Sequence, residues 1–185
     1  MKIIFILDYK TYYNSLFEVA YEASNYADTL WFRIKDVDAK IVIELCRKLR
    51  RMLPDKELFL SERADIASIC EFDGVHLGAN SIKPEIIKGK FNRLIVGYSA
   101  HSLKEIEEIE ADYFTLSPIF WTKKDYKVNP LGPLDVRNIG KKVFALGGIK
   151  ASNCSRIIGL GYSGIAGISL LEDLPHIKNL FNTTN

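Results

Sequence analysis

Eight short apolar runs, spaced evenly along 185 residues, constrain the fold of this chain more than any other feature. Each run is three to five residues long and rich in β-branched or aromatic side chains, and helical spacing follows several of them. This alternation and the count of eight predict an α/β fold, a compact (β/α)8 TIM barrel with short loops. An open doubly wound sheet is the alternative, because alternation alone does not establish closure. The runs are residues 3–7, 30–34, 58–60, 75–77, 94–96, 113–116, 143–146 and 165–168.

The stretches between these runs predict helices. The clearest is residues 39–49, where apolar side chains recur every three or four positions and Pro54 follows. Ser102 stands three residues before Glu105, which is the capping-box pattern at the start of a helix. Strands and helices are therefore expected to alternate to the end of the chain. Further helices are expected to start near Ser81 and to cover residues 151–160 and 174–181.

The length of the chain fits one domain. Division of 185 residues among eight units leaves about 23 residues each, against roughly 250 residues for a typical barrel, so the loops must be short. Hydrophobic residues make up 48% and charged residues 26%, as in an ordinary globular protein. We therefore expect a single barrel domain over residues 1–185, and the sequence leaves a homo-oligomer open.

Charge and cysteine content exclude several classes of function. The net charge is only +2 and no dense basic run occurs, so nucleic acid is not an expected partner. The apolar run at residues 3–7 meets Asp8 at once and is too short for a signal peptide or a membrane span, so we expect a cytoplasmic protein with no membrane partner. Cys46, Cys70 and Cys154 form no CxxC pair, so neither a disulfide framework nor a zinc site is indicated.

Two cations lie at the end of the second run, at the place where such barrels keep their active sites. Arg33 and Lys35 are two residues apart, so on a strand their side chains face the same way. Two inward cations are costly to bury unless an anion such as phosphate binds there. The alternative places Lys35 in an exposed loop, where it pairs with Asp36 or Asp38.

Glycine-rich turns follow the seventh and eighth runs. Gly147-Gly148-Ile149 and Gly167-Ile168-Ser169 each precede a candidate helix. Many barrels bind phosphate at these two turns through backbone N–H groups, and glycine permits the close approach. Tight packing at the turns is the alternative explanation.

The longest irregular stretch and the histidines give further candidates. The stretch covers residues 121–133 and is a candidate lid. Its Lys123 or Lys124 could clamp a leaving diphosphate, or both could belong to a solvated charge cluster. His101, in the loop after the fifth run, is the candidate for proton transfer, with a structural role as the alternative. His76 is expected in the core and His176 on the surface.

Five segments form a set that carries a family resemblance. They read FDGVHLG at residues 72–78, VGYSAHSLKE at 96–105, ADY at 111–113, SPIF at 117–120 and FALGGI at 144–149. Together, in this order and spacing, they resemble the thiamine phosphate synthase and TenI family. The resemblance extends over most of the chain, and it implies a (β/α)8 barrel that takes small phosphate substrates in thiamin biosynthesis.

The resemblance also implies site residues. In thiamine phosphate synthases, hydroxymethylpyrimidine diphosphate loses pyrophosphate with the help of Mg²⁺, and the nitrogen of a thiazole phosphate captures the pyrimidine cation. The positions that match the family's diphosphate-binding residues are Arg33, Lys35, Ser99, Thr122 and Lys123, and those that match its thiazole-phosphate contacts are Gly148, Ile168 and Ser169.

The chain departs from the synthase pattern around the metal. Trp31 stands where synthases have Gln, and Ser81 stands where they have the Asp that binds magnesium. The Asn-Asp pair after the third run is Ser61-Glu62 here, which leaves Glu62 as the one carboxylate for Mg²⁺. Tautomerases of the TenI branch lack these metal residues, but they carry His where this chain has Pro118.

These departures favour a TenI-like enzyme that binds thiazole phosphate and catalyses its tautomerisation. His101 or Glu62 is then the proton-transfer group, and no cofactor is needed. The first alternative is a divergent synthase that holds Mg²⁺ through Glu62 and depends on Lys123 for turnover. The second is a non-catalytic phosphate-binding or regulatory protein that has kept the anion pocket.

Overall fold

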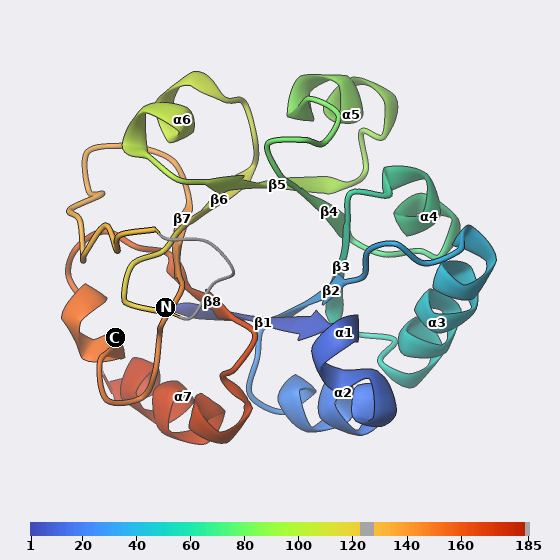
Figure 1. The fold of residues 1–185 in the computed structure, drawn as a ribbon, viewed down its shortest axis with the longest axis horizontal. Helices are drawn as coiled ribbons and strands as arrows, with labels where there is room; N and C mark the ends of the chain where they lie inside the picture. Colours follow the sequence, from blue (N-terminus) through green and yellow to red (C-terminus); the bar gives the residue numbers. More distant parts are fainter. Residues whose placement is uncertain (123–127, 184–185) are drawn as a thin grey trace.

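The computed structural model describes residues 1–122 and 128–183, and eight strands form its centre. The strands follow one another in chain order around a closed barrel (Figure 1). β1 pairs in parallel with β8 as well as with β2, so the sheet has no free edge and the open alternative is excluded. The predicted (β/α)8 barrel and its eight strand positions are confirmed. The strands are β1 (Lys2–Asp8), β2 (Thr29–Arg33), β3 (Glu57–Ser61), β4 (Gly74–Leu77), β5 (Ile95–Ala100), β6 (Tyr113–Leu116), β7 (Val143–Leu146) and β8 (Gly164–Gly167).

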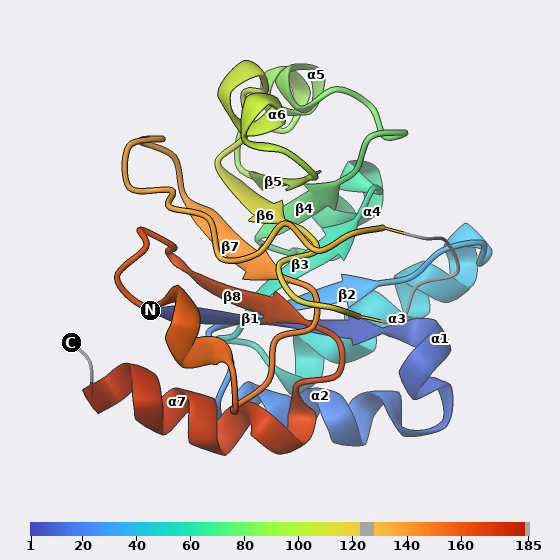
Figure 2. The ribbon, with the colours of Figure 1, turned by 60° about the vertical axis from the view of Figure 1, so that its left-hand side comes forward.

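Helices surround the barrel (Figure 2). The last helix returns to the first strands, where Lys178 pairs with Asp28 at 3.1 Å. Among the residues with a described position, no helix is long and apolar enough to cross a bilayer. The α-helices are α1 (Tyr9–Tyr12), α2 (Leu16–Ser24), α3 (Ala39–Met52), α4 (Ala64–Ile69), α5 (Pro84–Lys90), α6 (Leu103–Glu108) and α7 (Leu174–Thr183), and the 3₁₀ turns are η1 (Tyr13–Ser15), η2 (Cys154–Ile157) and η3 (Leu171–Asp173).

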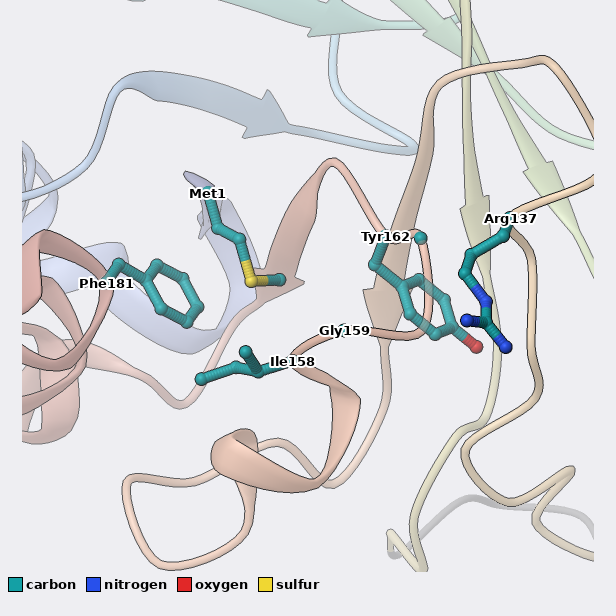
Figure 3. Close-up of a pocket in the computed structure, with 7 residues that line it drawn as sticks. Met1, Arg137, Ile158, Gly159, Tyr162 and Phe181 are labelled. Atoms are coloured by element: carbon teal, nitrogen blue, oxygen red, sulfur yellow. The ribbon is translucent and has the colours of Figure 1, made fainter. Parts of the chain in front are cut away.

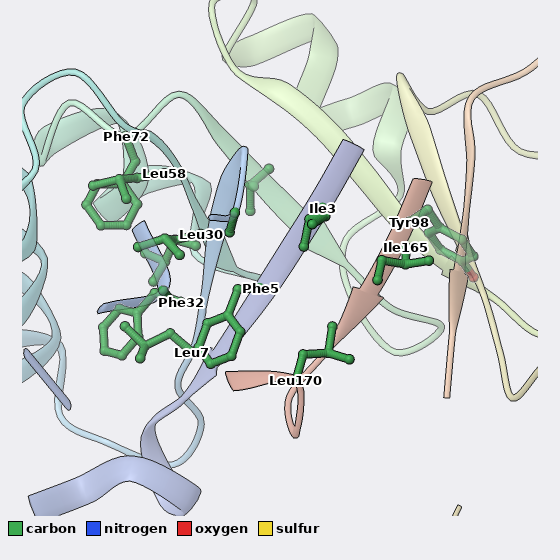
Figure 4. Packing of buried hydrophobic residues seen from close by; sticks show 14 of the residues in the cluster. Ile3, Phe5, Leu7, Leu30, Phe32, Leu58, Phe72, Tyr98, Ile165 and Leu170 are labelled. Carbon is green, nitrogen blue, oxygen red and sulfur yellow. The ribbon is translucent and has the colours of Figure 1, made fainter. Parts of the chain in front are cut away.

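Alternation along the strands sorts the core into an outer and an inner layer. On β1, Ile3, Phe5 and Leu7 belong to the outer layer that packs beneath the helices (Figure 4). Ile4 and Ile6 point the other way, into the barrel. Large side chains fill this interior, so a ligand has to bind at an end of the barrel rather than inside it. The inner layer is completed by Trp31, Phe59, Tyr113, Phe144 and Ala166.

The two most clearly predicted helices form as expected. α3 buries Val42, Cys46 and Leu49 against the barrel and extends past the predicted end to Met52. At the start of α6, the Ser102 hydroxyl accepts the N–H of Glu105 at 3.2 Å, which is the predicted cap. Apolar periodicity and capping chemistry were therefore sufficient to place these two elements.

The predicted helix over residues 151–160 was wrong. Only the short 3₁₀ turn η2 forms there, and Ile158, directly after it, is already extended with a ψ of 134°. Gly159 and Gly161 follow with left-handed φ values of 82° and 90°. The backbone therefore leaves the helical conformation before the predicted end.

The predicted start of α5 also needs correction. The helix begins at Pro84, whose missing N–H and fixed φ suit a first turn. Ser81 lies before it in a turn, where its hydroxyl accepts the N–H of Gly78 at 2.9 Å. Ser81 therefore stabilises the loop after β4 and does not cap the helix.

The connection from β6 to β7 breaks the predicted alternation. The part of it that the structure describes contains no helix. Backbone hydrogen bonds hold it on the end of the barrel instead. The N–H of Ile119 donates to the carbonyl of Leu146, and the N–H of Phe120 donates to that of Gly147, both at 2.9 Å. This segment therefore forms a wall beside the ends of the strands.

Candidate active site

A cavity of about 860 Å³ opens where the strands end. Its size is ordinary for a small-molecule site. Most of its lining comes from the last residues of the strands and from the loops that follow them, which is the position of the active site in barrel enzymes. Six of the predicted site residues line this cavity: Arg33, Ser99, Thr122, Gly148, Ile168 and Ser169.

His76 lies next to the cavity in a buried chain of hydrogen bonds. Its side chain is only 2% exposed. The Nδ1 atom lies 2.8 Å from the Tyr113 hydroxyl, and the Nε2 atom lies 2.9 Å from the Ser99 hydroxyl. Burial lowers the pKa of His76 to about 3, so the imidazole is neutral at physiological pH. The prediction of a core histidine with satisfied hydrogen bonds is confirmed.

Trp31 forms an aromatic part of the cavity wall. Its ring stacks on the His76 imidazole with centroids 3.7 Å apart. Its Nε1 donates to the Ser61 hydroxyl at 2.9 Å. These two contacts fix the orientation of the indole. The rings of Tyr113 and Phe59, also in the barrel interior, stack on each other with centroids 5.4 Å apart. The position that holds Gln in synthases is therefore a rigid apolar surface here.

Asp8 holds Arg33 at the edge of the cavity, and the sequence analysis missed this contact. The Asp8 carboxylate is buried and accepts hydrogen bonds from the Thr11 N–H, the Thr11 hydroxyl and the Arg33 guanidinium. Burial alone would raise the pKa of Asp8, but the bonds from Thr11 and Arg33 outweigh it and lower the pKa. The Tyr12 hydroxyl then donates to the carbonyl of Ile168 at 2.7 Å, which ties α1 to the end of β8. The sequence feature that could have indicated this contact is the position of Asp8 directly after the first apolar run, at the end of a predicted strand.

The turn after β7 has the backbone expected of a phosphate-binding site. Gly147 and Gly148 have positive φ values of 95° and 65°. A Cβ atom at Gly148 would lie 2.3 Å from the carbonyl oxygen of Trp121, so only glycine fits. Lys150, two residues farther along, lines the cavity as a second cation that the sequence analysis did not identify. Its position two residues after the glycine pair could have indicated that it lies at the same site.

Lys35 and Glu62 lie apart from the cavity lining and contradict two expectations. Lys35 is beyond the end of β2 rather than beside Arg33 on the strand. This matches the exposed-loop alternative, but the ammonium pairs with the Glu62 carboxylate at 2.8 Å rather than with Asp36 or Asp38, and both side chains are more than 40% exposed. The chain turns away after the strand because Asp36 adopts a left-handed φ of 57°. Glu62 is therefore neutralised by a cation rather than presented to a metal.

His101 and His176 also lie outside the cavity lining. His101 is exposed, and its Nδ1 lies 2.9 Å from the carbonyl oxygen of Ser117. This contact fits the structural role that the sequence left open for His101. His176 is on the surface of α7, as predicted. Lys123 and Lys124, either of which was expected to act on a diphosphate, lie outside the described residues.

The described side chains do not assemble a metal site. Within residues 1–122 and 128–183, no three His, Cys, Asp or Glu side chains come together to hold an ion. Ser61 is bonded to Trp31, and Ser81 is bonded to the backbone of Gly78. The Mg²⁺ ligands of the synthase pattern therefore have no matching cluster in the described part of this chain.

A second cavity, of about 370 Å³, lies near the amino ends of β1 and β8 (Figure 3). Met1, Ile158 and Phe181 form its apolar walls. The one cation at its edge, Arg137, is held by hydrogen bonds to the adjacent Asp135. None of the predicted site residues lies there, so the cavity at the carboxyl ends of the strands is the candidate active site.

Comparison with known proteins agrees with this geometry. A family model described as thiamine monophosphate synthase matches residues 3–171. A thiamine-phosphate synthase of Koribacter versatilis is 34% identical over 78% of this chain and 74% of its own length. A thiamine-phosphate synthase of Methanococcus maripaludis is 27% identical over 94% of this chain and 88% of its own length. The solved structure of thiamine phosphate pyrophosphorylase from Pyrococcus furiosus superposes with a TM-score of 0.82 at 28% identity, covering 99% of this chain and 94% of that one.

Proposed function

The chain belongs to the thiamine monophosphate synthase family, and on this premise we propose that it joins hydroxymethylpyrimidine diphosphate to thiazole phosphate. It is an enzyme of thiamin biosynthesis that acts on small phosphate compounds. The finer assignment, a synthase rather than a tautomerase, rests on one observation about the cavity. The cytoplasmic location expected from the sequence stays a prediction.

That observation is the presence of two kinds of anion-binding group in one cavity. The turns after β7 and β8 offer backbone N–H groups around Gly148 and Ser169, which suit a single phosphate. Elsewhere in the lining, Arg33, Ser99 and Thr122 supply one cation and two hydroxyls. A substrate with a single phosphate would need only one of these two sets of donors. A reaction between a diphosphate and a monophosphate needs both sets.

The residues present suit the chemistry of this transfer. The bond between the pyrimidine methylene carbon and the diphosphate oxygen breaks, and the electron pair leaves with the diphosphate. Negative charge grows on the diphosphate oxygens, and Arg33, Ser99 and Thr122 are the groups that would donate hydrogen bonds to it. The thiazole nitrogen then forms the new bond to the methylene carbon while its phosphate is held at the glycine turns. None of these steps requires a protein group to accept a proton.

The tautomerisation favoured by the sequence has weaker support. It requires a group that gives and takes a proton. Among the described residues that line the cavity, the side chains with an ionisable nitrogen or carboxyl group are Arg33 and Lys150. His101 and Glu62, the two groups expected to transfer the proton, are outside that lining. Tautomerase activity therefore stays a prediction and is the second candidate.

Mg²⁺ is implied for this chain by its family alone. Glu62, the carboxylate expected to hold the ion, contacts Lys35 and is not part of the cavity lining. The described side chains do not fit an Mg²⁺ site, so the steps above are assigned to the hydrogen-bond donors of the chain itself.

The test is a transfer assay. Purified protein is supplied with hydroxymethylpyrimidine diphosphate and thiazole phosphate, with and without Mg²⁺, and thiamin phosphate is measured by chromatography. We expect product from the wild type and a loss of turnover of about 100-fold in Arg33→Gln, because a donor to the growing charge is removed. Lys104→Gln is the matched control, since Lys104 is a cation on the exposed surface of α6.

Other outcomes would overturn the proposal in distinguishable ways. No thiamin phosphate under any condition, together with faster aromatisation of the thiazole carboxylate phosphate tautomer, would assign the chain to the tautomerases. Neither activity, with thiazole phosphate binding measured by calorimetry, would leave a non-catalytic phosphate-binding protein.

A further inference from the structure

The hydrogen bonds behind Ser99 fix the direction in which its hydroxyl points. Ser99 lines the cavity, and three buried side chains lead to it from inside the barrel: Tyr113, His76 and Thr115. A buried hydroxyl or imidazole N–H without an acceptor costs free energy, so the donors in such a chain are assigned by asking where each proton can go.

The assignment starts at Tyr113. Its side chain is 4% exposed, and within the described residues its hydroxyl has one hydrogen-bond partner, the Nδ1 of His76 at 2.8 Å. The ring is held in place because it lies over Gly97, where an added Cβ would be 2.1 Å from the ring. If the hydroxyl accepted a proton from His76, its own proton would be buried without an acceptor. Tyr113 is therefore the donor and Nδ1 the acceptor.

This direction sets the tautomer of His76. A neutral imidazole carries one N–H, and burial keeps His76 neutral by lowering its pKa. With Nδ1 as the acceptor, the proton is on Nε2. The Nε2 atom lies 2.9 Å from the Ser99 oxygen, so His76 donates to Ser99. The stacked Trp31 ring covers one face of the imidazole and keeps water from that side.

Thr115 completes the arrangement. It is fully buried, and its hydroxyl donates to the Ser99 oxygen at 3.4 Å. The Ser99 oxygen then accepts from both His76 and Thr115, which uses the two acceptor positions of a hydroxyl. The Ser99 proton has no partner on this side and is directed to the cavity, where Arg33 supplies positive charge.

We propose that Tyr113 and His76 are positioning residues, which hold the Ser99 hydroxyl as a hydrogen-bond donor directed into the cavity, toward the phosphate oxygen that the proposed function places there. The inference rests on the proposed function for the identity of the ligand. The state of the hydrogen-bond chain is a property of the free protein. A group in the cavity that approaches Ser99 has to be an acceptor, so a phosphate oxygen is favoured over an amine or ammonium.

The first test reads the tautomer directly. Protein with isotope-labelled histidine is studied by long-range nitrogen–proton NMR correlation, and the signals of the three histidines are assigned with His101→Gln and His176→Gln. We expect the ligand-free protein to show His76 protonated at Nε2 and unprotonated at Nδ1, with no change between about pH 5 and pH 9. Protonation at Nδ1 would overturn the inference.

The second test asks whether the direction matters for binding. Calorimetry with thiazole phosphate and with hydroxymethylpyrimidine diphosphate is carried out on Ser99→Ala and Tyr113→Phe. We expect the phosphate ligand that contacts Ser99 to bind about 10-fold more weakly to Ser99→Ala. Tyr113→Phe should weaken the same ligand by about threefold and give a second tautomer of His76, because the donor to Nδ1 is gone. Tyr98→Phe is the control, since it removes a hydroxyl from the outer face of β5, the strand that carries Ser99.

The outcomes separate this inference from the proposed function. Unchanged affinity for both ligands in Ser99→Ala would overturn the donor role even if the wild type is an active synthase. Failure of the wild type to bind either ligand would overturn the proposed function and the assignment of the phosphate oxygen. In that case the NMR result would still decide the direction of the hydrogen-bond chain.

Discussion

At the scale of single residues, Asp8 determines how Arg33 is presented to the substrate. The two side chains form a close ion pair, and Asp8 is itself fixed by two bonds from Thr11. Asp8→Asn keeps the shape of the side chain but removes its charge, so the guanidinium loses its anchor. We expect the KM for hydroxymethylpyrimidine diphosphate to rise about tenfold in steady-state kinetics. Asp65→Asn is the control, because Asp65 pairs with Arg63 at an exposed site on α4. Equal KM values for the two variants would contradict the orienting role.

His76 makes the stability of the protein depend on pH. Its pKa is about 3 in the fold, lowered from 6.5, so the unfolded chain takes up the proton first as the pH falls. The stability linked to neutral His76 is complete above about pH 6.5 and is lost toward pH 3, by about 1.4 kcal/mol per pH unit. Urea unfolding between about pH 7 and pH 4.5 should give a flatter profile for His76→Gln than for the wild type. The exposed His176→Gln should keep the wild-type slope, and a steep profile for His76→Gln would count against this account.

Part of the site was predictable from single residues. Arg33, Ser99 and Gly148 all lie within three residues of the end of an apolar run, so the rule that barrel sites lie at strand ends is enough to place them. Lys35 and Glu62 were not predictable. Their contact joins residues 27 positions apart. Glu62 is itself left-handed and Lys35 directly precedes the left-handed Asp36, a conformation that periodicity does not reveal.

At the scale of elements, two glycines with opposite surroundings test the packing of strands and helices. Gly97 on β5 lies under the Tyr113 ring, and an added Cβ would be 2.1 Å from it. Gly89 on α5 has nothing within 4 Å of its added Cβ. We expect Gly97→Ala to lower the free energy of unfolding by about 2 kcal/mol or more, and Gly89→Ala to raise it by up to about 1 kcal/mol. Denaturant unfolding measures both, and a change of the same sign in the two variants would contradict the packing described here.

Strands were easier to predict than the connections between them. A parallel strand that is buried on both faces needs a continuous apolar run, and all eight apolar runs correspond to strands in the structure. The failed helix at residues 151–160 shows what such patterns omit. There, only the 3₁₀ turn η2 forms, because the backbone is extended at Ile158 and left-handed at Gly159. The segment between β6 and β7 is held by backbone bonds to β7 and its turn, which no local pattern records.

At the scale of the whole molecule, closure was the part of the fold that the sequence left open. The count of eight favoured a barrel, but closure depends on the pairing of β1 with β8, from opposite ends of the chain. The register that joins them, Lys2 opposite Gly164, is a tertiary contact with no counterpart in local spacing. The sequence patterns were thus sufficient for the strands and their order, whereas the pairing of β1 with β8 came from the three-dimensional structure.

Ligand binding should stabilise this whole assembly, because the cavity is built from loops on both sides of the β1–β8 seam. At 100 times its Kd, thiazole phosphate should raise the free energy of unfolding by about 2.7 kcal/mol. For a chain of this length we expect Tm to rise by about 5 °C or more in a thermal scan. The thiazole alcohol without its phosphate is the control and should have little effect. Equal shifts from both compounds would contradict a phosphate-binding site.

The placement of the tryptophans has an optical consequence. The chain has two, and both line the cavity: Trp31 is 6% exposed and stacked on His76, whereas Trp121 is 76% exposed at the entrance. Their fluorescence should therefore differ in wavelength, with the buried indole emitting farther to the blue. A ligand that enters the cavity meets both rings and no tryptophan elsewhere. Intrinsic tryptophan fluorescence therefore reports ligand binding in this cavity. A change at the shorter emission wavelength indicates contact with the buried Trp31, and a change at the longer wavelength indicates contact with the exposed Trp121.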